Sequence, residues 1–132
     1  MKRRILYWVP TGLLVLMMTF GGIMDFMAGP EVLEVTRHLG YPDYFARMLG
    51  AAKILGVIAI LAPVPRWVRE WAYAGFTFDL IAAGISHLAV GDPITAVIPP
   101  VLGLVFVAAS HMGWRARLAE KDSTAATPSP AA

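Results

Sequence analysis

Apolar residues occur along this chain in four long runs that short polar segments separate. Each run approaches the roughly 20 residues that an α-helix needs to cross a hydrocarbon core about 30 Å thick. Backbone polar groups in lipid must be hydrogen-bonded within their own segment, so we expect each run to be a helix. The pattern predicts transmembrane helices over residues 5–27, 44–62, 71–90 and 94–114.

The connections between these runs predict how the helices are arranged. The second and third connections are short and contain proline, which favours antiparallel packing of consecutive spans. The longer first connection contains PEVLEVTRHLG, which predicts a short helix from Pro30 to a stop at Gly40. This helix would lie along the lipid headgroups or cap the bundle. We therefore expect an all-α polytopic membrane protein, an antiparallel bundle of four transmembrane helices.

Local signals set the expected boundaries within this bundle. Asp43 is expected to cap the second span, and Pro99 and Pro100 are expected to kink the fourth about two turns after its start. The first span follows a basic segment, but its apolar run is long and no convincing cleavage site follows, which predicts an uncleaved helix. The transmembrane domain would cover residues 1–119, and the composition of residues 120–132 predicts a disordered tail.

Composition and charge agree with a membrane protein and exclude several functions. The chain is 58% hydrophobic and 15% charged, and its formal net charge of +2 is too small to favour nucleic-acid binding. The absence of cysteine excludes disulfides, thiolate metal sites and covalently attached haem. Basic residues outside the spans gather on one side, which predicts that both termini face the cytoplasm in a multi-pass protein of the bacterial plasma membrane. They are Lys2, Arg3, Arg4, Arg66, Arg69, Arg115, Arg117 and Lys121, against Arg37 and Arg47 on the other side.

Two ionisable residues fall near the middle of their spans. At about 1.5 Å of rise per residue, Lys53 lies at the centre of the second span and Asp79 within about 3 Å of the centre of the third. The same arithmetic places Arg47 and His87 roughly 10 Å, and Asp25 roughly 13 Å, toward the outer face. A charge at this depth is costly, so Asp79 is the expected partner of Lys53. These five residues are the candidate ligand-binding or proton-relay residues, and no catalytic residue or metal ligand is assigned.

Two interpretations of this polar column stay open. Lys53 and Asp79 would either form a structural ion pair that fixes the helix register, or line a cavity for a ligand. His87 would either hydrogen-bond a carboxylate at the outer end of the column and change its charge with pH, or simply join two helices.

Four motifs in order along the chain resemble the DoxX-like family of small four-helix membrane proteins. They are HLGYPDYF (38–45), LGAAKILG (49–56), REWAYAGF (69–76) and SHLAVGDP (86–93), and the resemblance covers about residues 6–113. It implies kinship with the DoxX and DoxD group, which includes the membrane subunit of a thiosulfate:quinone oxidoreductase. That group has no agreed set of catalytic residues to transfer to this chain.

The functional prediction that follows is a membrane component of a redox or stress-related system, more plausibly a binding protein than an enzyme acting alone. It would bind a quinone-like or small polar ligand near Lys53 and Asp79, with a soluble or membrane redox enzyme as partner. The alternatives are a small-molecule or proton-coupled carrier, which would need a homo-oligomer, and a purely structural scaffold.

Overall fold

The computed structural model describes residues 2–126, except for the side chain of Arg3. Its elements are α1 (Lys2–Met27), α2 (Pro30–His38), α3 (Asp43–Leu61), α4 (Arg66–Ala89), the 3-10 helix η1 (Ile94–Val97) and α5 (Ile98–Ala126). No strand occurs among the described residues, so the predicted all-α class is confirmed. Three helices are long and apolar enough to cross a membrane, and they span Arg4–Met27, Asp43–Leu61 and Ile94–Ala126.

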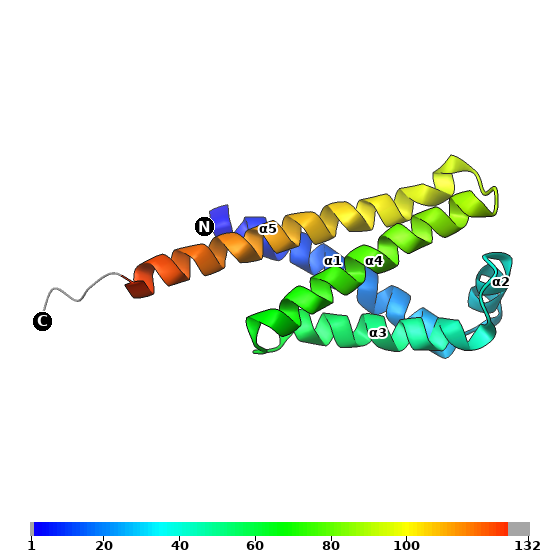
Figure 1. Cartoon of the computed structure of the whole chain (residues 1–132), viewed down its shortest axis with the longest axis horizontal. Helices are drawn as coiled ribbons and strands as arrows, with labels where there is room; N and C mark the ends of the chain where they lie inside the picture. Colours follow the sequence, from blue (N-terminus) through cyan, green and yellow to red (C-terminus); the bar gives the residue numbers. More distant parts are fainter. Residues whose placement is uncertain (1, 127–132) are drawn as a thin grey trace, which may run out of the picture.

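The long helices pack side by side, and the short helix α2 lies across one end of them (Figure 1). α1 packs against α3 and α5, while α4 packs against the same two helices. Large apolar side chains from all four long helices form one core among the described residues. Its buried members are Tyr7, Leu14, Met18, Val57, Ile60, Tyr73, Phe76, Leu80, Val107 and Trp114. α3 and α4 diverge toward α2, so that the two helices form a wedge (Figure 1).

Glycines bring α1 and α3 into backbone contact. A Cβ atom added at Gly50 would lie 2.6 Å from the carbonyl oxygen of Gly22 and would also meet the backbone nitrogen of Phe26. Interfaces of this kind are typical of membrane helices, because small residues let two backbones approach closely enough for extensive van der Waals contact. The pair of glycines therefore fixes how α1 and α3 sit against each other.

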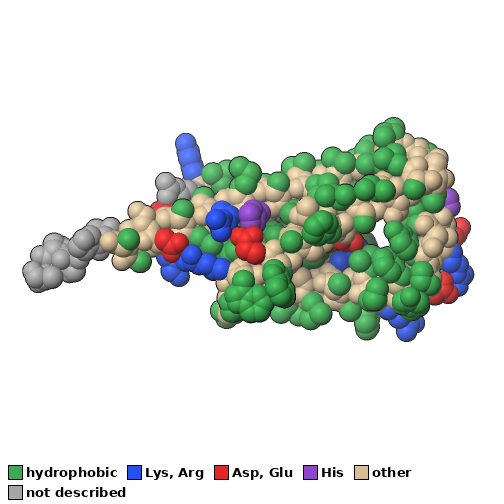
Figure 2. Space-filling view, viewed as in Figure 1, with side chains coloured by type: hydrophobic (Ala, Val, Ile, Leu, Met, Phe, Trp, Pro, Cys, Tyr) green, Lys and Arg blue, Asp and Glu red, His purple; other side chains and the backbone are tan. Residues whose placement is uncertain are grey.

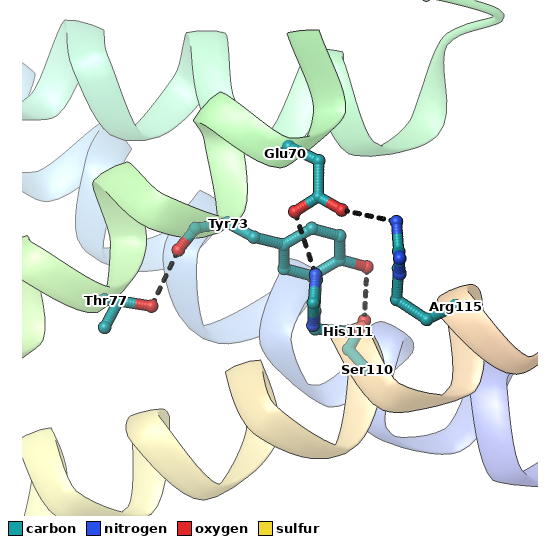
Figure 3. Close-up of polar contacts among 6 residues, drawn as sticks. All are labelled: Glu70, Tyr73, Thr77, Ser110, His111 and Arg115. Carbon is teal, nitrogen blue, oxygen red and sulfur yellow. Dashed lines mark hydrogen bonds and ion pairs between the residues drawn. The ribbon is translucent and has the colours of Figure 1, made fainter. Parts of the chain in front are cut away.

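Buried hydroxyl groups join three helices at the end of the bundle opposite α2. Ser110 of α5 contacts Thr11 of α1 at 2.6 Å and the hydroxyl of Tyr73 of α4 at 2.8 Å, and both Thr11 and Ser110 are fully buried. Figure 3 shows the Tyr73 and Ser110 pair beside a second contact between α4 and α5, in which Glu70 binds both His111 and Arg115. Such hydrogen bonds satisfy polar groups that lipid cannot and hold neighbouring helices in register.

Several boundaries differ from the sequence prediction for local reasons. Asp43 is the first residue of α3 rather than its cap, and its carboxylate binds the guanidinium of Arg37 instead. The expected kink at Pro99 and Pro100 is wrong, because the chain first forms η1 and both prolines then occupy the first turn of α5. Proline is tolerated there because the first turn of a helix has no intrahelical partner for its missing N–H group.

The ends of the short segments follow the predicted signals. α2 begins at Pro30 and ends before Gly40, whose φ of 90° is a left-handed conformation that glycine adopts without strain. α5 continues to Ala126, so residues 120–126 of the expected tail are helical. Residues 127–132 of that tail lie outside the described part of the chain.

The close contact of α1 and α3 predicts the effect of a methyl group at Gly50. Gly50→Ala places that methyl against the backbone of α1, which cannot move without separating the helices, so it should destabilise the fold by about 1–3 kcal/mol. The control Gly12→Ala lies in α1 with nothing within 4 Å of its added Cβ, and its unfolding midpoint should stay level or rise. Thermal unfolding in detergent compares the two variants, and equal midpoints would contradict the contact.

Candidate functional site

A cavity of about 640 Å³ lies in the wedge between α3 and α4, beneath α2. Figure 2 shows this hollow on the face in view, surrounded by apolar side chains and with charged groups at its inner end. Its wall is mainly apolar and is formed by α2, α3, α4, Asp25 of α1 and Tyr41 of the α2–α3 connection. The volume falls within the usual range for pockets that hold small organic ligands.

Three charged side chains meet in the lining of this cavity. The ammonium group Nζ of Lys53 donates a hydrogen bond to Oδ2 of Asp25 at 2.8 Å and lies 4.0 Å from Oδ2 of Asp79. Each of the three side chains is largely buried, with exposed fractions of 18%, 21% and 14% for Lys53, Asp25 and Asp79. Lys53 of α3 therefore has two carboxylate partners, one on α1 and one on α4, where the sequence predicted one.

The depths of these residues in their spans predicted Asp79 as the partner of Lys53 and placed Asp25 too far away. A depth calculated from the rise per residue gives the position of the backbone only, and not that of the end of the side chain. In a helix each Cα–Cβ bond tilts toward the N-terminus, and α1 and α3 run in opposite directions, so the side chains of Asp25 and Lys53 lean toward each other. Gly21 and Gly22 leave room for the lysine stem, since a Cβ atom at Gly22 would lie 3.1 Å from Cβ of Lys53. That pair of glycines, just before Asp25, is the signal that could have placed the carboxylate.

The helix α2 forms the outer wall of the cavity. Its lining residues Glu31, Val32, Val35 and Thr36 come from one face, and Leu39, directly after the helix, continues this wall. Of the two predicted positions for this helix, the structure therefore shows a cap over the bundle. Just after α2, the hydroxyl of Tyr41 lies 2.6 Å from the hydroxyl of Ser86 on α4 and ties this wall to the opposite side of the wedge.

A second set of hydrogen bonds connects α2 to the end of α4 and involves two histidines. One carboxylate oxygen of Asp92 contacts Nδ1 of His87 at 2.7 Å, and the other contacts Nε2 of His38, at the end of α2, at 2.6 Å. The hydrogen bonds from His87 and His38 hold the pKa of the Asp92 carboxyl below its usual range. His38, Asp92, Tyr41 and Ser86 did not emerge as site residues from the sequence, because their pairing depends on where α2 folds back.

Two of the five candidate residues lie apart from the charged group. His87 binds Asp92 rather than Asp25, and it is absent from the cavity lining. Arg47 is exposed and is also absent from that lining. The site that the structure assembles therefore consists of Lys53, Asp25 and Asp79.

The charges of the lining restrict the ligands that the cavity can accept. The lining contains Lys53 and the carboxylates of Asp25, Asp79 and Glu31, which gives one formal positive charge against three negative ones, or a net charge of −2. An anion would be repelled, whereas a neutral group that accepts a hydrogen bond from Lys53 or donates one to a carboxylate would fit. Within residues 2–126, no group of three or more His, Cys, Asp or Glu side chains is arranged to hold a metal ion.

Lys53 lies 2.8 Å from the carboxylate of Asp25 and 4.0 Å from that of Asp79. These distances predict that Asp25 contributes more than Asp79 to stabilising Lys53. A double-mutant cycle of Lys53→Met with Asp25→Asn should give a coupling energy of about 1.5–3 kcal/mol, the range for hydrogen bonds to charged groups. The cycle with Asp79→Asn should give a smaller value, because those charges lie 4.0 Å apart. Chemical unfolding in detergent measures both cycles, and a larger coupling to Asp79 would contradict the observed pairing.

Comparison with known proteins supports the resemblance seen in the motifs. The DoxX-like family matches residues 9–110, which contain Asp25, Lys53 and Asp79. The chain is 30% identical over 100 residues to the uncharacterized protein YdgD of Bacillus subtilis (strain 168), a match that covers 75% of this chain and 86% of that protein. No solved structure matches the chain. Because the family match spans most of the chain and includes the helices that form the cavity, the protein belongs to the DoxX-like family.

Proposed function

We propose that the chain is a multi-pass protein of the bacterial plasma membrane in which α1, α3, α4 and α5 all cross the bilayer. The case for α4 rests on how its side chains are distributed. Its 24 residues give a helix about 36 Å long, enough for a hydrocarbon core of about 30 Å. Asp79 and Tyr73 are directed inward, while Phe78 and Ile85 are 72% and 61% exposed and form an apolar outer surface. Polar residues that face the bundle lower the overall hydropathy of α4 without exposing charge to lipid.

The charges and aromatic residues at the ends of the helices support cytoplasmic termini. α1 begins, α3 ends and α4 begins at the same end of the bundle as the basic residues of α5. Trp8, Trp67 and Trp71 are exposed there, with exposed fractions of 50%, 57% and 71%. Exposed tryptophans are typical of the membrane interface, and an excess of Lys and Arg is typical of the cytoplasmic side. The end covered by α2 would then face the outside of the cell.

The cavity beneath α2 would bind a small, largely apolar molecule with a polar end, of which a quinone is the best example. The observation that supports this proposal is a mainly apolar wall in which Lys53, Asp25 and Asp79 meet at the inner end of the cavity. A quinone carbonyl would accept a hydrogen bond from Lys53, and a quinol hydroxyl would donate one to Asp25 or Asp79. The ring and its substituents would contact apolar residues such as Phe45 and Leu49.

Within this proposal the protein serves as the membrane-embedded binding component of a redox or stress-related system. The chain contains no cysteine, so it has no thiol chemistry of its own, and electron transfer would use the bound molecule and a partner enzyme. The negative lining disfavours small sulfur oxyanions as occupants of the cavity itself.

Ligand binding predicts stabilisation that depends on the cavity. A short-chain ubiquinone analogue at about 100 times its Kd should stabilise the purified protein by about 2.7 kcal/mol. The shift, measured against each variant's own ligand-free melting curve, should disappear in Lys53→Met and in Ala83→Phe, which fills the cavity wall. Ala89→Phe is the matched control, because Ala89 lies on the same helix, is exposed and does not line the cavity.

The variants also distinguish binding from a structural role. If Lys53 and its carboxylates only fix helix register, Lys53→Met will lower the melting temperature while no quinone stabilises the wild type. A ligand shift that Ala83→Phe leaves unchanged would mean that the molecule binds elsewhere. Either result would reject the proposed site.

The proposed topology can be tested by labelling single cysteines, because the natural chain has none that would react. Glu34→Cys, on the exposed side of α2, should react with a membrane-impermeant maleimide added to intact cells. Ala125→Cys, near the end of α5, should react only after the cells are opened. The opposite pattern would reverse the orientation, and labelling of both positions in intact cells would mean that the number of spans is odd.

A further inference from the structure

A second cavity, of about 500 Å³, lies at the end of the bundle opposite α2 and has different chemistry. It is formed where α1 and α4 begin and α3 ends, and α5 closes its remaining side. We refer to it as the basic pocket. Its lining consists of Tyr7, Trp8, Ile60, Leu61, Arg69, Trp114, Arg117, Leu118, Glu120 and Lys121, none of which lines the cavity beneath α2.

Aromatic rings hold the two arginines of the basic pocket. The guanidinium carbon of Arg69 lies 5.5 Å from the ring centre of Trp114, and that of Arg117 lies 4.8 Å from the ring centre of Tyr7. Among the described residues, neither arginine forms an ion pair with a carboxylate. With Lys121 and the carboxylate of Glu120, the lining has three formal positive charges and one negative, or a net charge of +2.

Neighbouring arginines outside the pocket behave differently. Arg66 forms two hydrogen bonds with the carboxylate of Asp122, at 2.7 and 2.9 Å, and Arg115 contacts Glu70 at 3.3 Å. At this end of the bundle, carboxylates therefore pair with Arg66 and Arg115 but not with the two arginines of the pocket. The arginines that line the pocket keep their charge for another partner.

Arg69 also has a donor that the protein does not use. Its Nη2 donates to the carbonyl oxygen of Ala62 at 2.9 Å, but its Nε is buried and has no hydrogen-bond partner. Nε of Arg69 is the one buried side-chain nitrogen or oxygen within residues 2–126 left in this condition. Buried donors are almost always paired, so the unused Nε shows that the protein's own acceptors do not saturate the guanidinium of Arg69 in the wall of this basic cavity.

We propose that the basic pocket binds a phosphate-bearing anion, namely the headgroup of an anionic phospholipid. The planar fork of arginine matches two phosphate oxygens, and two arginines on different helices could hold one phosphate between them. Ile60, Leu61 and Leu118 add apolar surface to the wall, which the glycerol and upper acyl carbons of a lipid would cover. A free phosphate ion would leave that surface without contacts. The bound lipid would join α4 to α5 at the basic end and does not depend on any ligand beneath α2.

The test measures lipid binding to the full chain by native mass spectrometry after delipidation in mild detergent. Phosphatidylglycerol should bind more tightly than phosphatidylcholine, and Arg69→Gln and Arg117→Gln should each weaken it roughly tenfold, as expected for losing a hydrogen bond to a charged group. Arg117→Lys keeps the charge but lacks the fork, so its affinity should lie between those of wild type and Arg117→Gln. Arg115→Gln is the matched control, since it removes one positive charge from the same end of α5 but not from the pocket.

The outcomes separate the site and its ligand. Circular dichroism of each variant confirms that its helices are intact, and Arg117→Lys supplies a readout if a glutamine variant does not fold. Equal phosphatidylglycerol affinity in Arg69→Gln, Arg117→Gln and Arg115→Gln would overturn the site. If inorganic phosphate protects the wild type from thermal unfolding as strongly as phosphatidylglycerol, and Arg69→Gln removes that protection, the ligand is a soluble anion and the lipid assignment is wrong.

Discussion

The hydrogen bond between Lys53 and Asp25 is the interaction on which the rest of the arrangement depends. An ammonium group among apolar helices costs several kcal/mol unless it is paired, so α3 must present Lys53 to a carboxylate. Its partner lies on α1, and the 2.8 Å contact forms only because glycines allow α1 and α3 to approach so closely. The glycine contact and the ion pair therefore support each other.

Lys53 is paired with α1 and lies farther from Asp79 of α4, at the end of the bundle that contains the cavity. α4 is held to α5 and α1 at its other end by the buried hydroxyls of Tyr73, Ser110 and Thr11. Toward α2 it diverges from α3, and Tyr41 and Ser86 bridge the gap rather than closing it. The bundle thus has one end tied by hydrogen bonds across its core and another that contains a cavity with charged groups at its base.

The two cavities have opposite electrical character, and each suits a different class of molecule. The cavity beneath α2 has more carboxylates than cations, whereas the basic pocket has more cations than carboxylates. This difference is the basis of the proposed occupants, a neutral amphiphile in the first and an anion in the second. In both cases a wall that combines charged and apolar residues favours molecules that have a polar end and an apolar body, as membrane lipids and quinones do.

Local patterns in the sequence were sufficient for much of this structure. Long apolar runs predicted helices, Pro30 and Gly40 predicted the limits of α2, and the cost of a charge in lipid indicated that Lys53 needed a carboxylate. Local signals failed where two of them competed. Pro99 and Pro100 indicated a kink, but the preceding residues form η1, which moved the start of α5 to Ile98.

The sequence by itself therefore determined the helical class and the need to pair Lys53, because helix formation and the cost of burying charge depend on residue type and spacing along one segment. Only the tertiary structure decided that Asp25 is the nearer partner, that α2 covers a cavity, and that His87 binds Asp92. Those outcomes depend on side-chain direction and on the distance between helices. Both are set by packing contacts between residues far apart in the chain, which helix rise within a single span does not describe.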